Sequence, residues 1–239
     1  VEALVEEALV ELGALAQQFE IICVDDGSVD GTAEIADRLA AEHPGVVRVV
    51  HHETNLGYGS ALRSGLAAAR FPLICFTDGD RQFRVADVAL LLQRMDTAGA
   101  TVDVVAGYRL RRADSALRLA YARVYRACLG AFFGLRVKDP DCACKLFRRE
   151  AFDCVRAESG GAFLSAELLI KIEAAGGIVV EQGVPHYART AGRASGADPR
   201  VVLRAVRDFW ALRLRLWANR SLALRRGQPV ISARSHEEP

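Results

Sequence analysis

Two acidic clusters, each directly after a short apolar run, are the residues of this chain best suited to chemistry. The first cluster is Asp25-Asp26 and the second is Asp78-Gly79-Asp80. Short apolar runs are typical of buried strands in a parallel sheet, and open α/β sheets bind their ligands beyond the carboxyl ends of such strands. Crowded carboxylates repel one another unless a cation or the donor groups of a ligand neutralise them. The two clusters therefore indicate a ligand site.

Divalent metal binding is the chemistry that Asp78 and Asp80 suggest. Two carboxylates on either side of one glycine can both reach a cation, and Mg²⁺ is commonly held by one or two protein carboxylates together with phosphate oxygens. Mg²⁺ or Mn²⁺ in that position would neutralise the charge of a departing diphosphate. The alternative is an acidic turn that binds nothing. For Asp25 and Asp26 the alternatives are an acceptor for the hydrogen bonds of a nucleoside, or a turn whose acids cap the next helix.

Glycine-rich and basic segments follow other expected strands. Gly57 lies in the sequence Asn-Leu-Gly-Tyr-Gly, where backbone N–H groups could approach a ligand or where glycine only permits a tight turn. Arg109 ends a further strand, and a guanidinium matches phosphate oxygens, although a solvated basic loop has the same composition. Arg189 and Arg193 belong to a second basic segment, which would either close over a phosphate or remain solvated.

The segments that must position these residues alternate between strand and helix patterns. Alternation of this kind predicts an α/β fold with a mostly parallel, right-handed doubly wound sheet. The chain opens in a helical pattern rather than a strand, and beyond Arg109 the alternation gives way to longer helices. We expect strands near 19–24, 46–51, 73–77, 102–107 and 178–184, and helices near 1–17, 32–41, 60–69, 85–98, 115–133, 165–175 and 199–217.

Composition limits the classes of function. The chain has 239 residues, of which 51% are hydrophobic, which is enough for one large domain. The net charge of +1 gives no general attraction for nucleic acid. Between residues 189 and 226, however, there are ten arginines and two aspartates, which predicts an anionic partner at the C-terminal end.

Cysteine usage and hydropathy predict the compartment. The six cysteines are expected to be reduced thiols of a cytosolic protein, and Cys142-x-Cys144 is too tightly spaced for a structural zinc site. The sequence has no uncharged apolar stretch of about 18 residues, the length that predicts a spanning helix. We expect a cytoplasmic protein that does not span a membrane by itself.

The last helical pattern combines apolar residues, arginines and two tryptophans. This composition favours a helix that lies on an anionic membrane, and the alternative is a surface helix packed only on its own domain. The expected organisation is a domain over residues 1–198, an amphipathic helix over 199–218 that contacts the membrane surface, and a disordered tail over 219–239.

The motifs, in their order and spacing, resemble the family 2 glycosyltransferases of GT-A fold over about residues 1–217. A narrower resemblance is to the branch of dolichyl-phosphate mannosyltransferases and polyprenyl-phosphate glycosyltransferases, which act in the synthesis of cell envelope glycans. Two departures are a missing first family strand and Arg81, which stands where relatives often carry a small or neutral residue. The family motifs are at 24–32, 55–59, 77–83 and 107–109, and the branch motifs at 139–147, Glu167 and 189–195.

The resemblance implies an enzyme that uses a nucleotide-sugar donor and Mg²⁺ or Mn²⁺, and that inverts the anomeric carbon. It places the nucleoside at Asp25, Asp26 and Gly57. It assigns the metal and the diphosphate to Asp78, Asp80 and Gln82, with Asp80 also counted as catalytic. It assigns donor or acceptor phosphates to Arg109, Arg189 and Arg193.

The acceptor decides the catalytic requirement. A polyprenyl phosphate is already an anion, so catalysis would rest on positioning and on stabilising the departing diphosphate, with Arg109 as a contributor. A sugar hydroxyl would need a carboxylate base, and Asp141 is the candidate. The alternatives are therefore a soluble family 2 enzyme that acts on a hydroxyl, or a catalytically inactive nucleotide-sugar-binding protein, which the missing strand suggests. A dinucleotide dehydrogenase is disfavoured because the first turn has acids where that site needs glycines.

Overall fold

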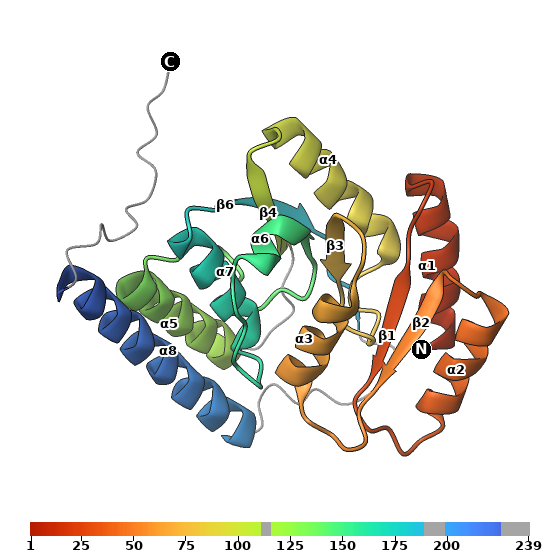
Figure 1. The fold of residues 1–239 in the computed structure, drawn as a ribbon, viewed down its shortest axis with the longest axis horizontal. Coiled ribbons are helices and arrows are strands. Elements are labelled where there is room, and N and C mark those ends of the chain that lie inside the picture. Colours follow the sequence, from red (N-terminus) through yellow and green to blue (C-terminus); the bar gives the residue numbers. More distant parts are fainter. Residues whose placement is uncertain (111–115, 189–198, 226–239) are drawn as a thin grey trace.

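The computed structural model describes residues 1–110, 116–188 and 199–225, and the side chains of 116–118 and 219–225 are outside that description. Arg189 and Arg193, which the sequence predicts to bind phosphates, also lie outside the described residues. The expected α/β fold is confirmed, with helices on both faces of the strands (Figure 1).

The strands form two sheets. In the first sheet, β1 (Ile21–Asp25) pairs in parallel with β2 (Val47–His51). The second sheet has the order β3-β5-β4-β6, in which β4 and β6 are parallel and β5 is antiparallel to both of its neighbours. The alternation of strand and helix patterns in the sequence did not predict the antiparallel strand β5. The bounds of the second sheet are β3 Leu73–Phe76, β4 Val102–Arg109, β5 Lys145–Arg148 and β6 Ile178–Val184.

The two sheets are joined by side-chain packing rather than by backbone pairing. Helix α1 (Glu2–Leu15) lies beside β1 and places Ala8 against Val85, in a cluster that also includes Ile21 of β1 and Cys75 of β3. In the described part of the chain, no strand precedes β1. In this arrangement α1 is the element that packs against residues of both sheet edges.

The remaining helices cover the second sheet on both sides. Helix α7 (Leu164–Ala174) is apolar around most of its circumference and is therefore buried at the centre of the main core, together with residues of α5 and α8. Helix α4 packs on the opposite face against Val105 and Leu146. The helix bounds are α2 Thr32–Glu42, α3 Tyr58–Ala68, η1 Val85–Asp87, α4 Val88–Ala98, α5 Ala116–Phe133, α6 Arg149–Asp153 and α8 Pro199–Arg225.

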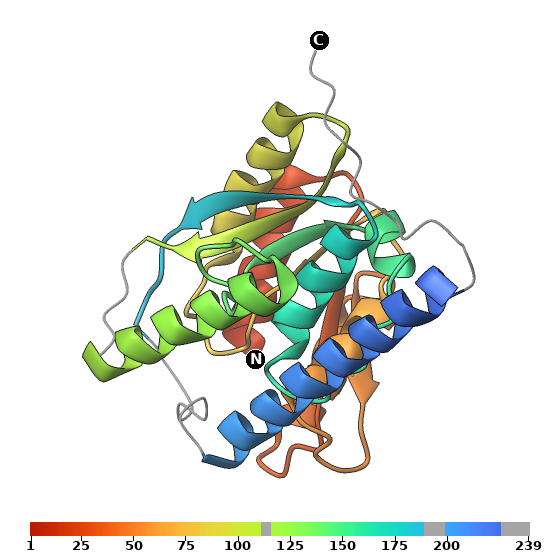
Figure 2. The same cartoon turned by 90° about the vertical axis from the view of Figure 1, so that its left-hand side faces the viewer.

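Helix α8 is longer than the sequence pattern predicted. It continues to Arg225, past the boundary expected at residue 218, because residues 219–225 include no glycine or proline and are mostly good helix formers. Residues 226–239, part of the tail expected to be disordered, lie outside the described residues. Figure 2 shows α8 running along the side of the molecule that also carries α5 and α7. None of the described helices is both long and apolar enough to cross a bilayer.

Candidate functional site

The turn after β3 carries the carboxylates of Asp78 and Asp80. The Asp80 Oδ1 atom accepts the backbone N–H of Gln82 at 2.9 Å, which closes a tight turn. The Asp78 carboxylate is hydrogen-bonded to Tyr58, the first residue of α3. Tyr58 is 39% exposed as a residue, but its hydroxyl end is desolvated, and this desolvation together with the Asp78 charge raises the pKa of Tyr58 well above its ordinary value. The hydroxyl therefore stays protonated and holds Asp78 in place.

The loop before β5 brings a second set of carboxylates to this region. Asp141 is hydrogen-bonded to Tyr125 of α5, and its charge also contributes to the raised pKa of Tyr58, after desolvation and Asp78. The charges of Asp141 and Asp78 therefore both act on the Tyr58 hydroxyl, although 63 positions separate the two residues in the sequence. The fold thus brings the predicted base, Asp141, and the predicted metal ligand, Asp78, into the surroundings of one tyrosine.

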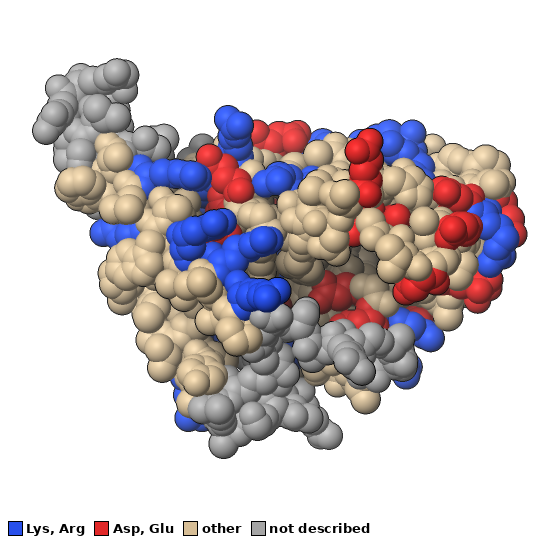
Figure 3. Space-filling model, turned by 90° about the horizontal axis from the view of Figure 1, so that it is seen from below, with Lys and Arg blue, Asp and Glu red and all other residues tan. Residues whose placement is uncertain are grey.

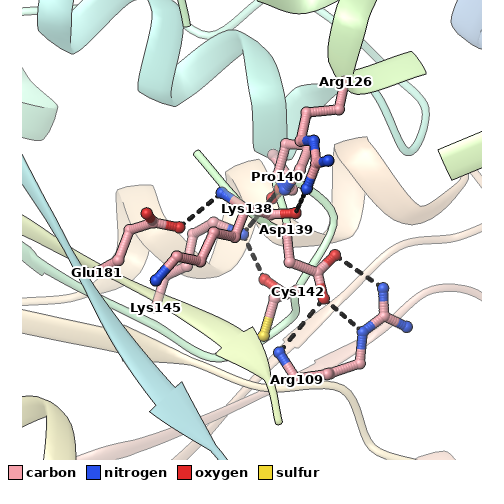
Figure 4. Close-up of polar contacts among 9 residues, drawn as sticks. Arg109, Arg126, Lys138, Asp139, Pro140, Cys142, Lys145 and Glu181 are labelled. Carbon is pink, nitrogen blue, oxygen red and sulfur yellow. Dashed lines mark hydrogen bonds and ion pairs between the residues drawn. The ribbon is translucent and has the colours of Figure 1, made fainter. Parts of the chain in front are cut away.

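Arg109, at the end of β4, is held by Asp139 in a two-pronged ion pair. The Arg109 Nε–Asp139 Oδ2 distance is 2.6 Å and the Nη2–Oδ1 distance is 2.8 Å (Figure 4). Both side chains are largely buried, at 15% and 5% exposure. Arg109 was predicted to contact a phosphate, and the structure shows that its guanidinium also anchors the loop that carries Asp141.

A buried lysine supports the same loop from beneath. Lys145 of β5 has no exposed surface, and its ammonium donates to Ser165 Oγ at 2.7 Å, to Pro140 O at 3.0 Å and to Cys142 O. Desolvation lowers the pKa of Lys145, and nearby negative groups, including Asp141, act in the opposite direction. The role of Lys145 was not predicted, and a lysine flanked by Cys144 and Leu146 in an apolar run was the signal that could have revealed it.

The first acidic cluster is engaged with the protein backbone. Asp26 accepts the N–H groups of Leu56 and Gly57 at 2.9 and 2.8 Å, and also contacts His52 Nδ1 at 2.6 Å. Desolvation acts to raise the pKa of Asp26, but the hydrogen bonds from His52, Leu56 and Gly57 lower it overall. Asp26 therefore joins the end of β1 to the turn before α3.

Asp25 and Gly57 have equally specific structural partners. Asp25 accepts the Ser28 N–H at 3.1 Å and contacts His51 Nδ1 at 3.2 Å, as expected for a turn-forming acid. Gly57 has a φ of 94°, which favours glycine, and a Cβ there would lie 3.0 Å from Arg204 Nη1 of α8. The nucleoside-binding role predicted for these residues remains a prediction.

Gln82 links the turn of Asp78 and Asp80 to the segment that follows β6. Its side-chain nitrogen donates to Tyr187 O at 3.4 Å, and its backbone oxygen accepts the Tyr187 N–H at 3.0 Å. The Arg84 guanidinium also lies 4.4 Å from the centre of the Tyr187 ring. These contacts place the chain that leads to Arg189 beside the turn of Asp80, while the role of Gln82 as a metal ligand stays a prediction.

A basic cavity of about 270 Å³ opens beside Arg109, between the end of β4 and α5. Arg126 Nη1 donates to the backbone oxygen of Lys138 at 3.4 Å (Figure 4). The Lys138 ammonium lies 4.2 Å from the centre of the Tyr108 ring. Sequence reasoning missed Arg123, Arg126 and Lys138, although the three-residue spacing of the arginines on one helix was visible. The lining residues are Tyr108, Arg109, Leu119, Ala122, Arg123, Arg126, Lys138 and Asp139.

One face of the molecule combines both charges. Figure 3 shows acidic side chains inside a hollow of the molecule and lysine and arginine side chains gathered beside it. A hollow with carboxylates next to a cationic margin can bind a ligand that carries phosphates through a cation and through guanidinium groups. The arrangement therefore suits phosphate-bearing ligands.

Comparison with known proteins gives relatives of one kind. Glycosyltransferase AglD of Haloferax volcanii is 33% identical over 172 residues, which are 70% of this chain and 27% of that protein. An undecaprenyl-phosphate 4-deoxy-4-formamido-L-arabinose transferase of Pseudomonas fluorescens is 32% identical over 143 residues, 60% of this chain and 41% of that protein. The chain thus spans less than half of the length of these relatives.

A solved structure and a family match agree with these relatives. Glucosyl-3-phosphoglycerate synthase from Mycobacterium tuberculosis, in complex with Mn²⁺ and UDP-glucose, superposes with a TM-score of 0.62 at 22% identity, covering 86% of this chain and 73% of that one. This likeness shows the shared fold. The family described as glycosyl transferase family 2 matches residues 2–156, which is more than half of the chain. On the strength of that match, the chain belongs to glycosyl transferase family 2.

Proposed function

We propose that this protein transfers a sugar from a nucleotide-sugar to a polyprenyl phosphate, with inversion at the anomeric carbon, at the cytoplasmic face of a membrane. The observation that carries the proposal is the basic cavity beside Arg109, which is lined by residues of α5 and by Asp139, two positions before Asp141. The names of relatives that act on undecaprenyl phosphate and dodecaprenyl phosphate support the same acceptor.

The carboxylates of Asp78 and Asp80 fit a divalent cation that would also bind phosphate oxygens of the donor diphosphate. Among the described residues, no group of three or more histidine, cysteine, aspartate or glutamate side chains is placed to hold a metal by itself. Asp78 and Asp80 supply two carboxylates on one turn, which is the usual protein share for Mg²⁺ on a nucleotide. Mg²⁺ or Mn²⁺ bound there would stabilise the negative charge of the departing diphosphate. In this proposal Gln82 assists these carboxylates, and Asp25, Asp26 and Gly57 form the nucleoside end of the site.

The acceptor phosphate would occupy the basic cavity. Arg123, Arg126 and Lys138 present cationic groups there, and Arg109 forms part of the wall. A phosphate oxygen attacks the anomeric carbon while the bond from that carbon to the diphosphate oxygen breaks, and the diphosphate leaves with the electron pair. Because the attacking oxygen already carries negative charge, the protein residues need only position it. Arg189 and Arg193 remain proposed phosphate ligands.

A second candidate acceptor is a hydroxyl of a sugar or another small molecule. The position of Asp141 favours it, since this carboxylate lies by the Asp78 turn and could accept a proton. Such an enzyme would not need the cationic cavity. The acceptor assay described next separates the two.

We expect undecaprenyl phosphate to be the better acceptor when the protein is supplied with Mn²⁺ and UDP-, GDP- or dTDP-sugars. The measurement is the product detected by mass spectrometry in detergent, with undecaprenyl phosphate compared with free sugars and phosphorylated small alcohols. Transfer only to hydroxyl acceptors would contradict the polyprenyl proposal and support the second candidate. Binding of a nucleotide-sugar without any turnover would instead indicate an inactive binding protein.

Replacing Arg123 and Arg126 together by alanine should raise the KM for the acceptor phosphate by about tenfold to 100-fold, because each removes a charge-assisted hydrogen bond to phosphate. The KM for the nucleotide-sugar should stay within about twofold, since the cavity does not include Asp78 or Asp80. Initial rates measured against each substrate check this. Arg94→Ala on α4, on the other side of the sheet, is the matched control. An equal rise in both KM values would show that the cavity is not the binding site of the acceptor.

The neighbouring surface explains how a lipid acceptor would be reached. Phe132 of α5 meets Trp210 of α8, with ring centres 5.2 Å apart, and in this proposal the exposed apolar residues of the two helices act together as one membrane-facing region. Arginines of α8 lie around this region, which suits anionic headgroups. We call it the α5–α8 apolar face. Its members are Tyr121, Val124, Phe132, Val202, Leu203, Val206, Trp210, Leu214 and Trp217, which are 40–71% exposed.

Replacing Trp210 and Leu214 by serine should weaken binding to vesicles of phosphatidylglycerol and phosphatidylcholine by at least about tenfold. Both side chains are exposed in the protein, and burying each one in a membrane stabilises binding by about 1.5–3 kcal/mol when complete. Vesicle flotation measures the effect. Val10→Ser on α1 is a control, because Val10 is 72% exposed but lies outside the α5–α8 apolar face. Equal binding of the double variant and the wild type would exclude this face as the membrane contact.

A further inference from the structure

Arg81 lies within the turn of the two carboxylates, directly after Asp80. An arginine can form strong two-pronged hydrogen bonds with a carboxylate, so a guanidinium at this position is able to compete with a divalent cation for Asp78 or Asp80. The structure directs the side chain of Arg81 elsewhere. Arg81 has a φ of 59°, and it is the one non-glycine residue with positive φ in the described part of the chain.

Glu7 of α1 holds Arg81 in this orientation. Its Oε2 atom lies 3.1 Å from Arg81 Nη2. Its Oε1 atom accepts the backbone N–H of Val85, the first residue of η1, at 2.9 Å. The Glu7 side chain is 18% exposed. Its carboxylate connects the side chain of Arg81 with the backbone of Val85, four residues further along the chain.

The position of Glu7 is itself fixed by packing. The neighbouring α1 residues Val5 and Ala8 are buried, and Ala8 contacts the cluster that contains Val85 and Val88. Helix α1 therefore cannot move away from η1 without exposing apolar surface, which is unfavourable. The ion pair between Glu7 and Arg81 bridges a rigid helix and the turn that carries Asp80.

We propose that Glu7 is a positioning residue for the divalent cation: it binds the Arg81 guanidinium, keeps that charge away from Asp78 and Asp80, and fixes the turn that follows Asp80. This inference rests on the metal site of the proposed function. It assigns to α1, an element that carries no predicted site residue, a role in metal affinity.

The test is the affinity for Mn²⁺ alone, measured from the electron paramagnetic resonance signal of free Mn²⁺. Glu7→Gln should weaken Mn²⁺ binding by about threefold to fivefold, the size expected when a partly exposed ion pair is lost. Arg81→Gly should bind Mn²⁺ as tightly as the wild type or more tightly, because glycine accepts the positive φ and brings no competing charge. The double variant should match Arg81→Gly. Glu6→Gln, an exposed glutamate on the same helix, controls for the loss of one negative charge.

Three results would overturn the inference. The first is unchanged Mn²⁺ affinity in Glu7→Gln. The second is an equal loss of affinity from Glu7→Gln with and without Arg81→Gly, since Glu7 would then act through Val85 alone. The third is weaker binding by Arg81→Gly itself, which remains measurable even if Glu7→Gln fails to fold. Absence of Mn²⁺ binding by the wild type would contradict the proposed metal site, and the inference with it.

Discussion

Asp80→Asn should reduce metal-dependent sugar transfer by about 100-fold to 1,000-fold without unfolding the protein. The substitution removes a negative charge from the proposed metal site, and metal ions stabilise transition-state charge by several kcal/mol, where each 1.36 kcal/mol is a factor of ten in rate. The side-chain oxygen of asparagine can still accept the Gln82 N–H, which Asp80 Oδ1 accepts at 2.9 Å. The measurement is kcat at saturating Mn²⁺, together with the melting temperature.

The control for this prediction is Asp96→Asn on α4, which removes the same charge from an exposed position. We expect the control to keep the wild-type rate, and both variants to melt within a few degrees of the wild type. If Asp80→Asn retained its rate at saturating and at limiting Mn²⁺, the metal assignment at Asp78 and Asp80 would be wrong. If the rate fell only because the protein had melted, the negative charge of Asp80 would serve the stability of the fold rather than the metal.

Arg109→Ala should lower the free energy of unfolding by about 3–5 kcal/mol, because it leaves the buried carboxylate of Asp139 without its partner. The ion pair has two close contacts, 2.6 and 2.8 Å, and both side chains are largely buried. This predicted loss is structural and adds to any effect on phosphate binding. Urea unfolding, with the slope compared between variants, measures it.

Arg123→Ala provides the contrast, since Arg123 lines the same cavity but is exposed. Substitutions of exposed residues away from special features change stability by about 0.5 kcal/mol or less. Replacing Arg109 and Asp139 together by leucine should recover part of the stability lost in Arg109→Ala, because no unpaired charge is then buried. If Arg109→Ala cost no more than Arg123→Ala, the ion pair would not support the loop of Asp141.

The carboxylates of Asp78 and Asp80 could be located from sequence because their placement is local. They follow the end of β3 by two and four residues, and strand, turn and carboxylates are contiguous in the sequence. The same holds for Asp25 and Asp26, but their partners are not local. Asp26 accepts N–H groups 30 and 31 positions away, so composition alone left open whether it serves a ligand or the turn.

The amphipathic helix shows the same division. The aromatic contacts of Phe209 with Phe133 and Phe163 show that one side of α8 packs on the domain. Val202, however, is 50% exposed, and Trp210 and Trp217 belong to a second apolar region that faces outward. A helix with two apolar faces can bury either of them, and packing against the rest of the domain decides which one is buried.

The fold class, the glycosyltransferase family and the two acidic strand ends could be predicted from the sequence, because each depends on residues that are close along the chain. Which distant groups come together depends on the tertiary structure. Tyr58 binds Asp78, Tyr125 binds Asp141, Lys145 supports the loop before β5, Arg123 and Arg126 line the cationic cavity, and Glu7 restrains Arg81. These contacts connect elements separated by tens of residues, and their existence depends on how helices and strands pack, which local patterns do not specify.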